Sequence, residues 1–243
     1  MWHFCFYKHI LYGAAVTFGL ESANVVGYQN ISTPAGYSMR AATFKAIDGD
    51  YKISDIQVSG DDIGYGNEYG QVVEADGSWG ATYYYLSVNV GAPEDGWYKD
   101  MFGIEPVTDE DTLSVGQAFF FNASMAVTLT YSGQVIEGRP SVALPAGYSM
   151  LGNPTPTTAK FADITVTGED IGYGNEYGQK VLPSGDWGDT YYYLSVNVGA
   201  PEDGWYKDMF GIEPVTDTDV IDAGESLFFN SSVDIVVAFP AAL

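Results

Sequence analysis

Short apolar runs separated by turn residues form the main pattern of the chain beyond its first two dozen residues. Runs rich in Val, Ile, Tyr and Phe recur roughly every ten residues, with Gly, Asp, Asn or Pro between them. No segment there carries the 3.6-residue apolar period of an amphipathic helix. The pattern predicts an all-β protein, with strands in its first half at Ile53–Val58, Gln71–Glu74, Tyr83–Val90, Gln117–Asn122 and Met125–Tyr131 and counterparts later in the chain.

The chain carries one sequence unit twice. The motifs PAGYSM, IGYGNEYGQ and YYYLSVNVGAPEDGWYKDMFGIEPVTD occupy Pro34–Met39, Ile63–Gln71 and Tyr83–Asp109, and they recur at Pro145–Met150, Ile171–Gln179 and Tyr191–Asp217. No Pro- or Ser-rich linker separates the two copies. We therefore predict two tandem homologous β-sandwich or small-barrel domains, 24–133 and 134–243, each of ordinary domain size.

The N-terminus has the pattern of an export signal. Lys8 and His9 precede the apolar run Ile10–Leu20, and the small residues Ser22 and Ala23 follow it. We predict a signal peptide over residues 1–23 and a secreted or cell-surface location. The alternative is a buried N-terminal segment, because Glu21 stands where a small residue is preferred before the cleavage point.

The residues after this leader lack the side chains of many enzymes. The only cysteine is Cys5 and the only histidines are His3 and His9. Ser-His-Asp and Cys-His catalysis, zinc sites built on these ligands and disulfides within the mature chain are therefore excluded. A carboxylate-pair glycosidase stays open, since Asp and Glu suffice for that chemistry. Two near-identical copies without insertions to shape a cleft argue against it, and we expect no enzyme.

The charge of the chain is strongly negative. Nine Lys and Arg residues face 32 Asp and Glu residues, for a formal net charge of −23. Such a surface repels phosphate backbones, so nucleic acid and anionic lipids are not expected as partners. We expect no membrane insertion after removal of the leader. The partners that fit are other copies of the chain, other surface proteins or neutral polysaccharide.

The candidate binding residues are aromatic. If Tyr83–Val90 is a strand, then Tyr84, Leu86, Val88 and Val90 face the core. Tyr rings on the other face, with a Trp beside the next turn, predict a platform for stacking on sugars or docking a protein. In the alternative, these rings cover a neighbouring loop or plug the end of the core. The candidates are Tyr83, Tyr85 and Trp97, with Tyr191, Tyr193 and Trp205 in the second copy.

Acidic turn residues are weaker candidates for calcium. Calcium takes six to eight oxygen ligands, commonly from loop carboxylates and carbonyls. The acidic turns GAPEDG and EPVTDED do not follow the spacing of an EF-hand loop. The competing interpretation is that these acids are solvated turn residues. We expect no cofactor. The residues concerned are Glu94, Asp95 and Asp109, with Glu202, Asp203 and Asp217 in the second copy.

The order of these motifs resembles a group of uncharacterised exported bacterial β-repeat proteins. The resemblance rests on PAGYSM, the D-I-x-V segment at Asp55–Val58, the YYY strand, GWY, and a glycine followed by a Phe-rich strand. It implies a surface or secreted location and brings no catalytic residues. Together with the tandem repeat, it favours a non-enzymatic structural or adhesive surface protein. The alternative is a carbohydrate-binding protein that uses its Tyr and Trp surfaces.

Overall fold

The computed structural model describes residues 26–46, 49–74, 77–102, 104–182 and 184–242. The predicted signal peptide over residues 1–23 lies outside them. The described residues are all-β, and their helices are four 3₁₀ turns of three residues each. None of the helices described is long and apolar enough to cross a membrane.

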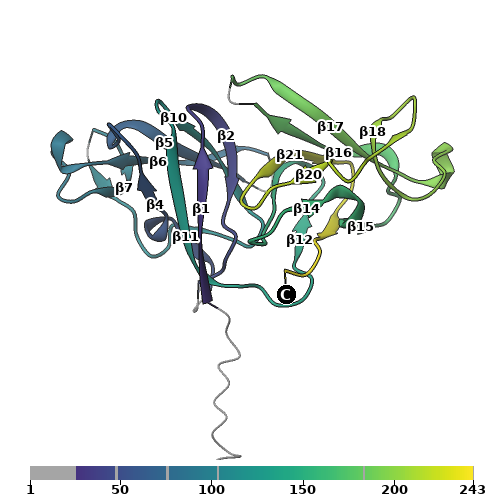
Figure 1. Ribbon diagram of the computed structural model, residues 1–243, viewed down its shortest axis with the longest axis horizontal. Helices are drawn as coiled ribbons and strands as arrows, with labels where there is room; N and C mark the ends of the chain where they lie inside the picture. Colours follow the sequence, from purple (N-terminus) through teal and green to yellow (C-terminus); the bar gives the residue numbers. More distant parts are fainter. Residues whose placement is uncertain (1–25, 47–48, 75–76, 103, 183, 243) are drawn as a thin grey trace, which may run out of the picture.

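The first half of the chain forms three antiparallel sheets (Figure 1). The three-stranded sheet has the order β1-β11-β4, and the six-stranded sheet has the order β2-β10-β5-β6-β7-β8. A third sheet pairs β3 with β9. The bounds are β1 Val26–Thr33, β2 Gly36–Ala41, β3 Tyr51–Lys52, β4 Gln57–Ser59, β5 Tyr65–Val73, β6 Trp79–Leu86, β7 Gly96–Asp100, β8 Glu105–Pro106, β9 Thr112–Leu113, β10 Ala118–Ala123 and β11 Val127–Gln134.

The second half repeats this arrangement strand for strand. Its sheets have the orders β12-β22-β15, β13-β21-β16-β17-β18-β19 and β14-β20. Every sheet thus takes its strands from a single half of the chain. The bounds are β12 Ser141–Leu144, β13 Gly147–Gly152, β14 Ala159–Lys160, β15 Thr165–Gly168, β16 Tyr173–Val181, β17 Trp187–Leu194, β18 Gly204–Asp208, β19 Glu213–Pro214, β20 Val220–Ile221, β21 Ser226–Ser231 and β22 Ile235–Ala238.

Each half packs its three- and six-stranded sheets around an apolar core. In the first half, Leu129 of the smaller sheet and Phe121 of the larger belong to the same buried cluster. The second half has an equivalent cluster made from different side chains. Positions occupied by Ile53, Phe119 and Tyr131 in one core hold Phe161, Leu227 and Phe239 in the other.

The predicted strands have different boundaries in the structure: Gln71–Glu74 is only the end of β5, and two others run into 3₁₀ turns. Ile53–Val58 begins with the 3₁₀ turn η1 (Ile53–Asp55) and becomes a strand only at Gln57. Tyr83–Val90 ends as a strand at Leu86 and continues as the 3₁₀ turn η2 (Val88–Val90). Gly91 ends this turn with φ +94°, a left-handed conformation that glycine adopts at little cost. The second half has equivalent turns, η3 (Phe161–Asp163) and η4 (Val196–Val198).

The two halves meet along the strands β2 and β13 and the residues around them. We call this contact the seam. The N–H of Ala41 donates to the carbonyl of Gly224 at 3.0 Å, and the N–H of Gly152 donates to that of Gly116 at 2.8 Å. These donors occupy the same position in the two copies, as do the acceptors. The seam therefore has an approximate two-fold symmetry inside one chain.

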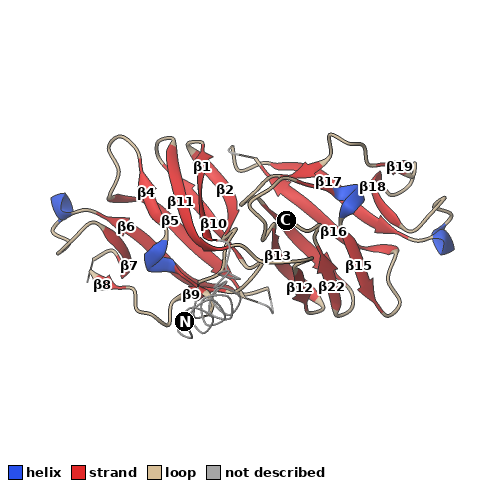
Figure 2. Ribbon diagram, turned by 60° about the horizontal axis from the view of Figure 1, so that its bottom comes forward, coloured by secondary structure: helices blue, strands red, loops and turns tan. Residues whose placement is uncertain are grey.

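Apolar side chains from both halves fill the seam. Met39, Ala41, Val73 and Ala118 form a buried cluster with Met150, and Phe120, Val181 and Phe228 pack against it. The halves lie side by side along the long axis of the molecule, and a short helix marks each extreme end (Figures 1 and 2). These two end helices are η2 in the first half and η4 in the second.

Candidate functional site

Trp97 and Trp205, expected to lie beside an exposed turn, are core residues. Each side chain is only 4% exposed. The indole N–H of Trp97 donates to the carbonyl of Ile56 at 2.7 Å, and that of Trp205 donates to Ile164 at 3.0 Å. A buried ring with its polar atom already bonded offers no face to a ligand, so the platform role is wrong for both and the alternative interpretation, a tryptophan packed in the core, describes them.

Tyr83 and Tyr191 are buried as well, with 7% and 2% of each residue exposed. The Tyr83 hydroxyl donates to Oδ1 of Asp111 at 3.2 Å, and the Tyr191 hydroxyl donates to Oδ1 of Asp219 at 3.4 Å. Burial, followed by the neighbouring Asp111, raises the pKa of Tyr83 to about 12. The hydroxyls of these tyrosines therefore bond a carboxylate at the edge of the core. The prediction that their rings are exposed is also wrong.

Tyr85 and Tyr193 are half-buried and pack on the same cores. The Tyr85 ring lies edge-on to Trp97, with 5.7 Å between ring centroids, and Tyr193 meets Trp205 at 5.6 Å. The prediction reversed the faces of this strand. Its odd-numbered positions face the main core, while Tyr84 and Leu86 pack with Tyr98 in a second, smaller cluster. From Tyr83 to Leu86, both faces of β6 are therefore packed, one on the main core and the other on the smaller cluster.

Three aromatic residues of each six-stranded sheet form a partly exposed cluster near the seam. We call Tyr37, Trp79 and Phe120 the first aromatic cluster, and Tyr148, Trp187 and Phe228 the second. Trp79 and Trp187 are 56% and 55% exposed, and Tyr148 is 48% exposed. These clusters replace Tyr83, Tyr85 and Trp97 as the candidate binding surface.

Each cluster is built around a half-buried phenylalanine. Phe120 lies 5.2 Å from Tyr37 and 5.9 Å from Trp79 between ring centroids. In the second cluster, Phe228 stacks on Tyr148 at 5.3 Å and meets Trp187 at 5.5 Å. The three rings of a cluster come from three strands of one sheet, for example β2, β6 and β10. Their packing gives each exposed ring a fixed support.

A second row of tyrosines continues each cluster across its sheet. Tyr177 hydrogen-bonds the hydroxyl of Tyr148, and this bond, followed by burial, raises the pKa of Tyr177 to about 12. Tyr177 also lies against Tyr192, with 5.9 Å between centroids. Tyr69 and Tyr84 have the equivalent arrangement in the first half, at 6.1 Å. The exposed rings of each cluster, with tyrosine hydroxyls beside them, suit stacking on sugar rings or apolar side chains.

The sequence did contain signals for these clusters. Trp79 and Trp187 stand in the turn motifs GSWG and GDWG, and Tyr37 and Tyr148 are part of the repeated PAGYSM. What the sequence lacked was the pairing of strands that brings the motifs together. Tyr37 and Phe120 lie far apart in the chain and become neighbours only because β2 pairs with β10.

A fully buried carboxylate explains the repeated IGYGNEYGQ motif. Glu68 and Glu176 are 0% exposed. Oε2 of Glu68 accepts from the N–H of Gly64 at 2.9 Å, and Oε1 accepts from the Ser124 hydroxyl at 3.2 Å. Glu176 makes the same two bonds to Gly172 and Ser232. Each glutamate therefore ties two turns together, and both of its carboxylate oxygens accept hydrogen bonds inside the fold.

The calcium candidates are not brought together. Among the described residues, no three or more His, Cys, Asp or Glu side chains form a group that could hold a metal ion. Oδ1 of Asp95 accepts from the N–H of Val88 at 2.9 Å, and Asp203 does the same for Val196. Asp109 instead pairs with Lys52, and Asp217 pairs with Lys160, both at 2.9 Å. Glu94 and Glu202 accept a Tyr98 or Tyr206 hydroxyl through their backbone carbonyls. The structure therefore does not assemble these acids into a calcium site, and the competing interpretation, acids that bond within turns or pair with lysine, describes Asp95, Asp109 and their counterparts.

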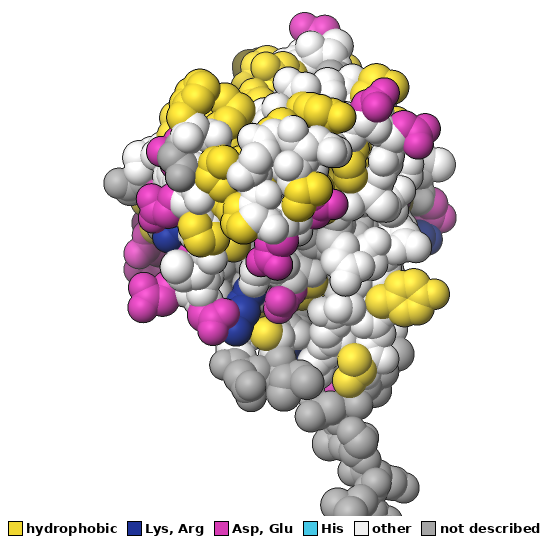
Figure 3. Space-filling view, turned by 90° about the vertical axis from the view of Figure 1, so that its left-hand side faces the viewer, with side chains coloured by type: hydrophobic (Ala, Val, Ile, Leu, Met, Phe, Trp, Pro, Cys, Tyr) yellow, Lys and Arg dark blue, Asp and Glu magenta, His cyan; other side chains and the backbone are white. Residues whose placement is uncertain are grey.

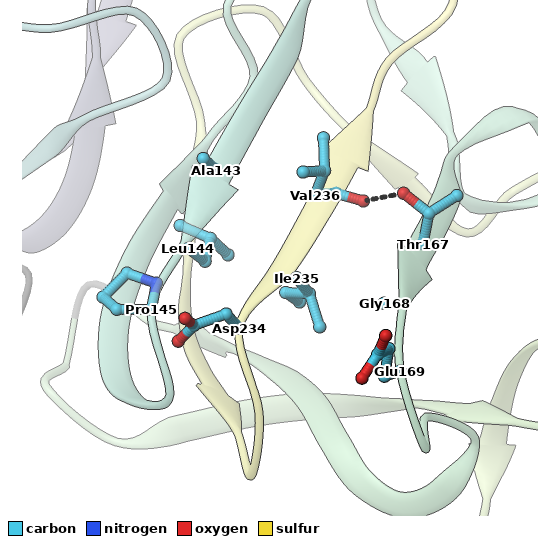
Figure 4. Close-up of a pocket in the computed structure, with 9 residues that line it drawn as sticks. All are labelled: Ala143, Leu144, Pro145, Thr167, Gly168, Glu169, Asp234, Ile235 and Val236. Carbon is cyan, nitrogen blue, oxygen red and sulfur yellow. Dashed lines mark hydrogen bonds between the residues drawn. The ribbon is translucent and has the colours of Figure 1, made fainter.

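A shallow depression on the smaller sheet of the second half has little chemistry to offer (Figure 4). Leu144 and Ile235 lie on its floor, and Asp234 and Glu169 stand on its rim. Asp234 already accepts the N–H of Ala146 at 2.9 Å, and Thr167 bonds the carbonyl of Val236. With its aliphatic floor, this depression is a poorer candidate than the aromatic clusters.

Comparison with known proteins adds no identity. No family model, no curated protein and no solved structure matches the chain. The functional proposal for this chain therefore rests on the chemistry of its own residues.

Proposed function

We propose that the chain is an exported, non-enzymatic surface protein of two tandem β-sandwich domains, with a structural or adhesive role. One observation carries this proposal: the two ends of the elongated molecule carry identical exposed residues. The doubled stretch Tyr83–Asp109 and Tyr191–Asp217 forms both ends, and about half of it is exposed. One chain can then make the same contact twice. Two simultaneous contacts raise the overall binding strength of the chain on any surface that displays a partner repeatedly.

Cell binding and electron microscopy test this proposal. The purified chain, carrying a fluorescent label, is added to cells and examined in parallel by negative-stain electron microscopy. Binding to cells, or regular filaments or sheets, supports the proposal. Dispersed molecules that bind nothing on cells contradict it.

A second function, binding of neutral polysaccharide, is favoured by the aromatic clusters. Trp79 and Trp187 are more than half exposed and each is supported by a phenylalanine. In a polysaccharide pull-down, we expect Trp79→Ala with Trp187→Ala to abolish binding while the fold persists. Tyr28→Ala is the matched control, because Tyr28 is an exposed aromatic residue (75%) on β1, outside both clusters. Equal binding by the double variant and the control removes this function.

A further inference from the structure

Each six-stranded sheet carries two rows of side chains on its outer face, the face turned away from the main core. In β10, Phe119 and Phe121 belong to that core. Phe120 and Asn122 alternate with them along the strand and therefore lie on the outer face. Cross-strand register extends each of these two residues into a row over β2, β10, β5 and β6. One row is Tyr37, Asn122, Tyr69 and Tyr84, and the other is Met39, Phe120, Gln71 and Thr82.

The second half has the same two rows over β13, β21, β16 and β17. Strand pairing there places the same residue types in the same order, so the chain displays this face twice. One row is Tyr148, Asn230, Tyr177 and Tyr192, and the other is Met150, Phe228, Gln179 and Thr190.

None of the side chains in the rows is charged, although the formal net charge of the chain is −23. Acidic side chains are spread over the end face of the first half instead (Figure 3). The rows combine aromatic rings with amide and hydroxyl groups, and they offer no cation to a polyanion and no anion to a polycation. An uncharged face of this kind on a strongly acidic protein fits a neutral partner.

The rows are partly open to solvent and continue the aromatic clusters across each sheet. Trp79, the most exposed ring of the first cluster, pairs with Val73 at the edge of the rows. Gln71 and Thr82 are half-buried, and Tyr84 at the far end packs partly against the smaller cluster. A ligand that stacks on the exposed rings therefore has polar side chains within its reach on the neighbouring strands.

The amide groups of the rows are held in place before a ligand arrives. Nε2 of Gln71 donates to the carbonyl of Gly80 at 3.2 Å. Nδ2 of Asn122 donates to the carbonyl of Asn67 at 3.2 Å. The second half makes the same two bonds at 3.3 and 3.0 Å. Fixing these side chains in advance lowers the ordering cost of a contact, and an amide oxygen can accept a bond from a sugar hydroxyl.

We propose that a chain of neutral, linear polysaccharide lies along the rows of each six-stranded sheet and crosses its strands. The rings stack on sugar faces, while Gln71, Thr82 and Asn122 bond the sugar hydroxyls. Adjacent strands lie about 4.8 Å apart, close to the length of one sugar unit in an extended chain. Successive units therefore meet successive side chains of a row. This inference rests on the polysaccharide binding proposed above and extends that site beyond the aromatic clusters.

Affinity electrophoresis tests the proposal in gels that contain glucomannan, mixed-linkage β-glucan or dextran, which are all neutral. We expect at least one polymer to retard the unchanged chain. Gln71→Ala with Gln179→Ala should weaken that binding about three- to tenfold, the value of one hydrogen bond at each site. Thr82→Val with Thr190→Val, which keeps the side-chain shape and removes only the hydroxyl, should have a similar effect. Gln57→Ala is the matched control, because Gln57 is exposed on β4 of the smaller sheet.

Thermal unfolding of each variant shows that it stays folded, and the pattern of binding then separates the two proposals. If Trp79→Ala with Trp187→Ala abolishes binding while the glutamine and threonine variants bind like the unchanged chain, polysaccharide binding stands and the rows are not part of the site. If none of the three polymers retards the unchanged chain, both proposals fail.

Two further results would overturn the inference by pointing to another partner. Equal retardation by alginate, which is anionic, or loss of binding in about 1 M salt would show that charge drives the contact. Oligomers of the unchanged chain in sedimentation velocity, absent from the variant that lacks Trp79 and Trp187, would assign the face to a protein contact.

Discussion

The indole N–H of Trp97 donates a 2.7 Å hydrogen bond to the backbone carbonyl of Ile56. This bond connects β7 to the residue that follows η1, and both groups are buried. It converts a tryptophan that follows a turn into a structural clamp inside the core. The equivalent bond between Trp205 and Ile164 shows that the second half uses the same clamp.

Replacing Trp97 by phenylalanine should destabilise the protein. The variant loses the donor and leaves the Ile56 carbonyl buried without it, which costs about 1–3 kcal/mol, and the smaller ring adds a cavity. Urea unfolding measures the change. The control is Trp79→Phe, at a half-exposed ring, with an expected change within about 0.5 kcal/mol. Equal effects of the two variants would show that the clamp does not stabilise the fold.

Asp219 should make the protein sensitive to acid. Burial alone would raise the pKa of Asp219, but bonds from Thr216 and Lys207 outweigh it and hold the pKa below its usual value of 3.8. The folded state therefore binds the proton less tightly than the unfolded state does. The stability from this carboxylate is present above pH 4 or so and is lost as the pH falls through the lowered pKa.

The Asp219→Asn variant tests this dependence. The substitution should cost about 1.5–3 kcal/mol near neutral pH, because charge-assisted hydrogen bonds are lost, and it should flatten the acid limb of a stability–pH curve. Asp217→Asn is the matched control, since its exposed pair with Lys160 contributes about 0–1 kcal/mol. An acid limb that is the same in both variants would refute the assignment.

The buried tyrosines should make the protein sensitive to base. Burial raises the pKa of Tyr83 from 10.0 to about 12, and burial also raises the pKa of Tyr191. An unfolded tyrosine ionises first, so the stability is full below pH 10 and falls as the pH rises toward 12. Ultraviolet absorbance of tyrosinate, recorded together with unfolding, measures this. Tyr83→Phe should make the alkaline limb shallower, and an unchanged limb would contradict the prediction.

Gly224→Ala should disturb the seam. Gly224 has φ +70°, and a Cβ atom there would collide with the Ile31 side chain of the other half. We expect a cost of about 1–3 kcal/mol from overpacking, together with a larger radius of gyration in small-angle X-ray scattering as the halves separate. Gly204→Ala is the control, because no atom lies within 4 Å of its Cβ position. If both variants keep the radius of the unchanged chain, the seam tolerates the extra atom.

The strands could be predicted because their signals are local. Alternating residues and turn formers mark β10 and β11 to within a few residues but only the last three residues of β5, and the doubled motifs mark the repetition of the sheets. The faces of β6 could not be predicted, because both are aromatic or apolar and both are covered. The end of this strand was also missed, since YYYLSVNV continues the alternation into η2.

The burial of single side chains depends on partners distant in sequence. The hydroxyl that donates to the Glu68 carboxylate belongs to Ser124, and the carbonyl that accepts from the Trp97 indole belongs to Ile56. When only neighbours in sequence are considered, a glutamate without a buried cation indicates solvent, and a tryptophan after a turn fits either the end of the core or an exposed surface. The aromatic clusters were missed for the same reason, because strand pairing assembles them.

The donors at the seam, Ala41 and Gly152, belong to edge strands of the two six-stranded sheets. The opposite edges are β8 and β19, two-residue strands that end in Pro106 and Pro214, which have no N–H to offer. Neither edge is therefore a good template for an added strand, the usual first step of amyloid growth. Strand addition at these edges of the six-stranded sheets is therefore disfavoured, and any contact that another molecule makes there falls to side chains.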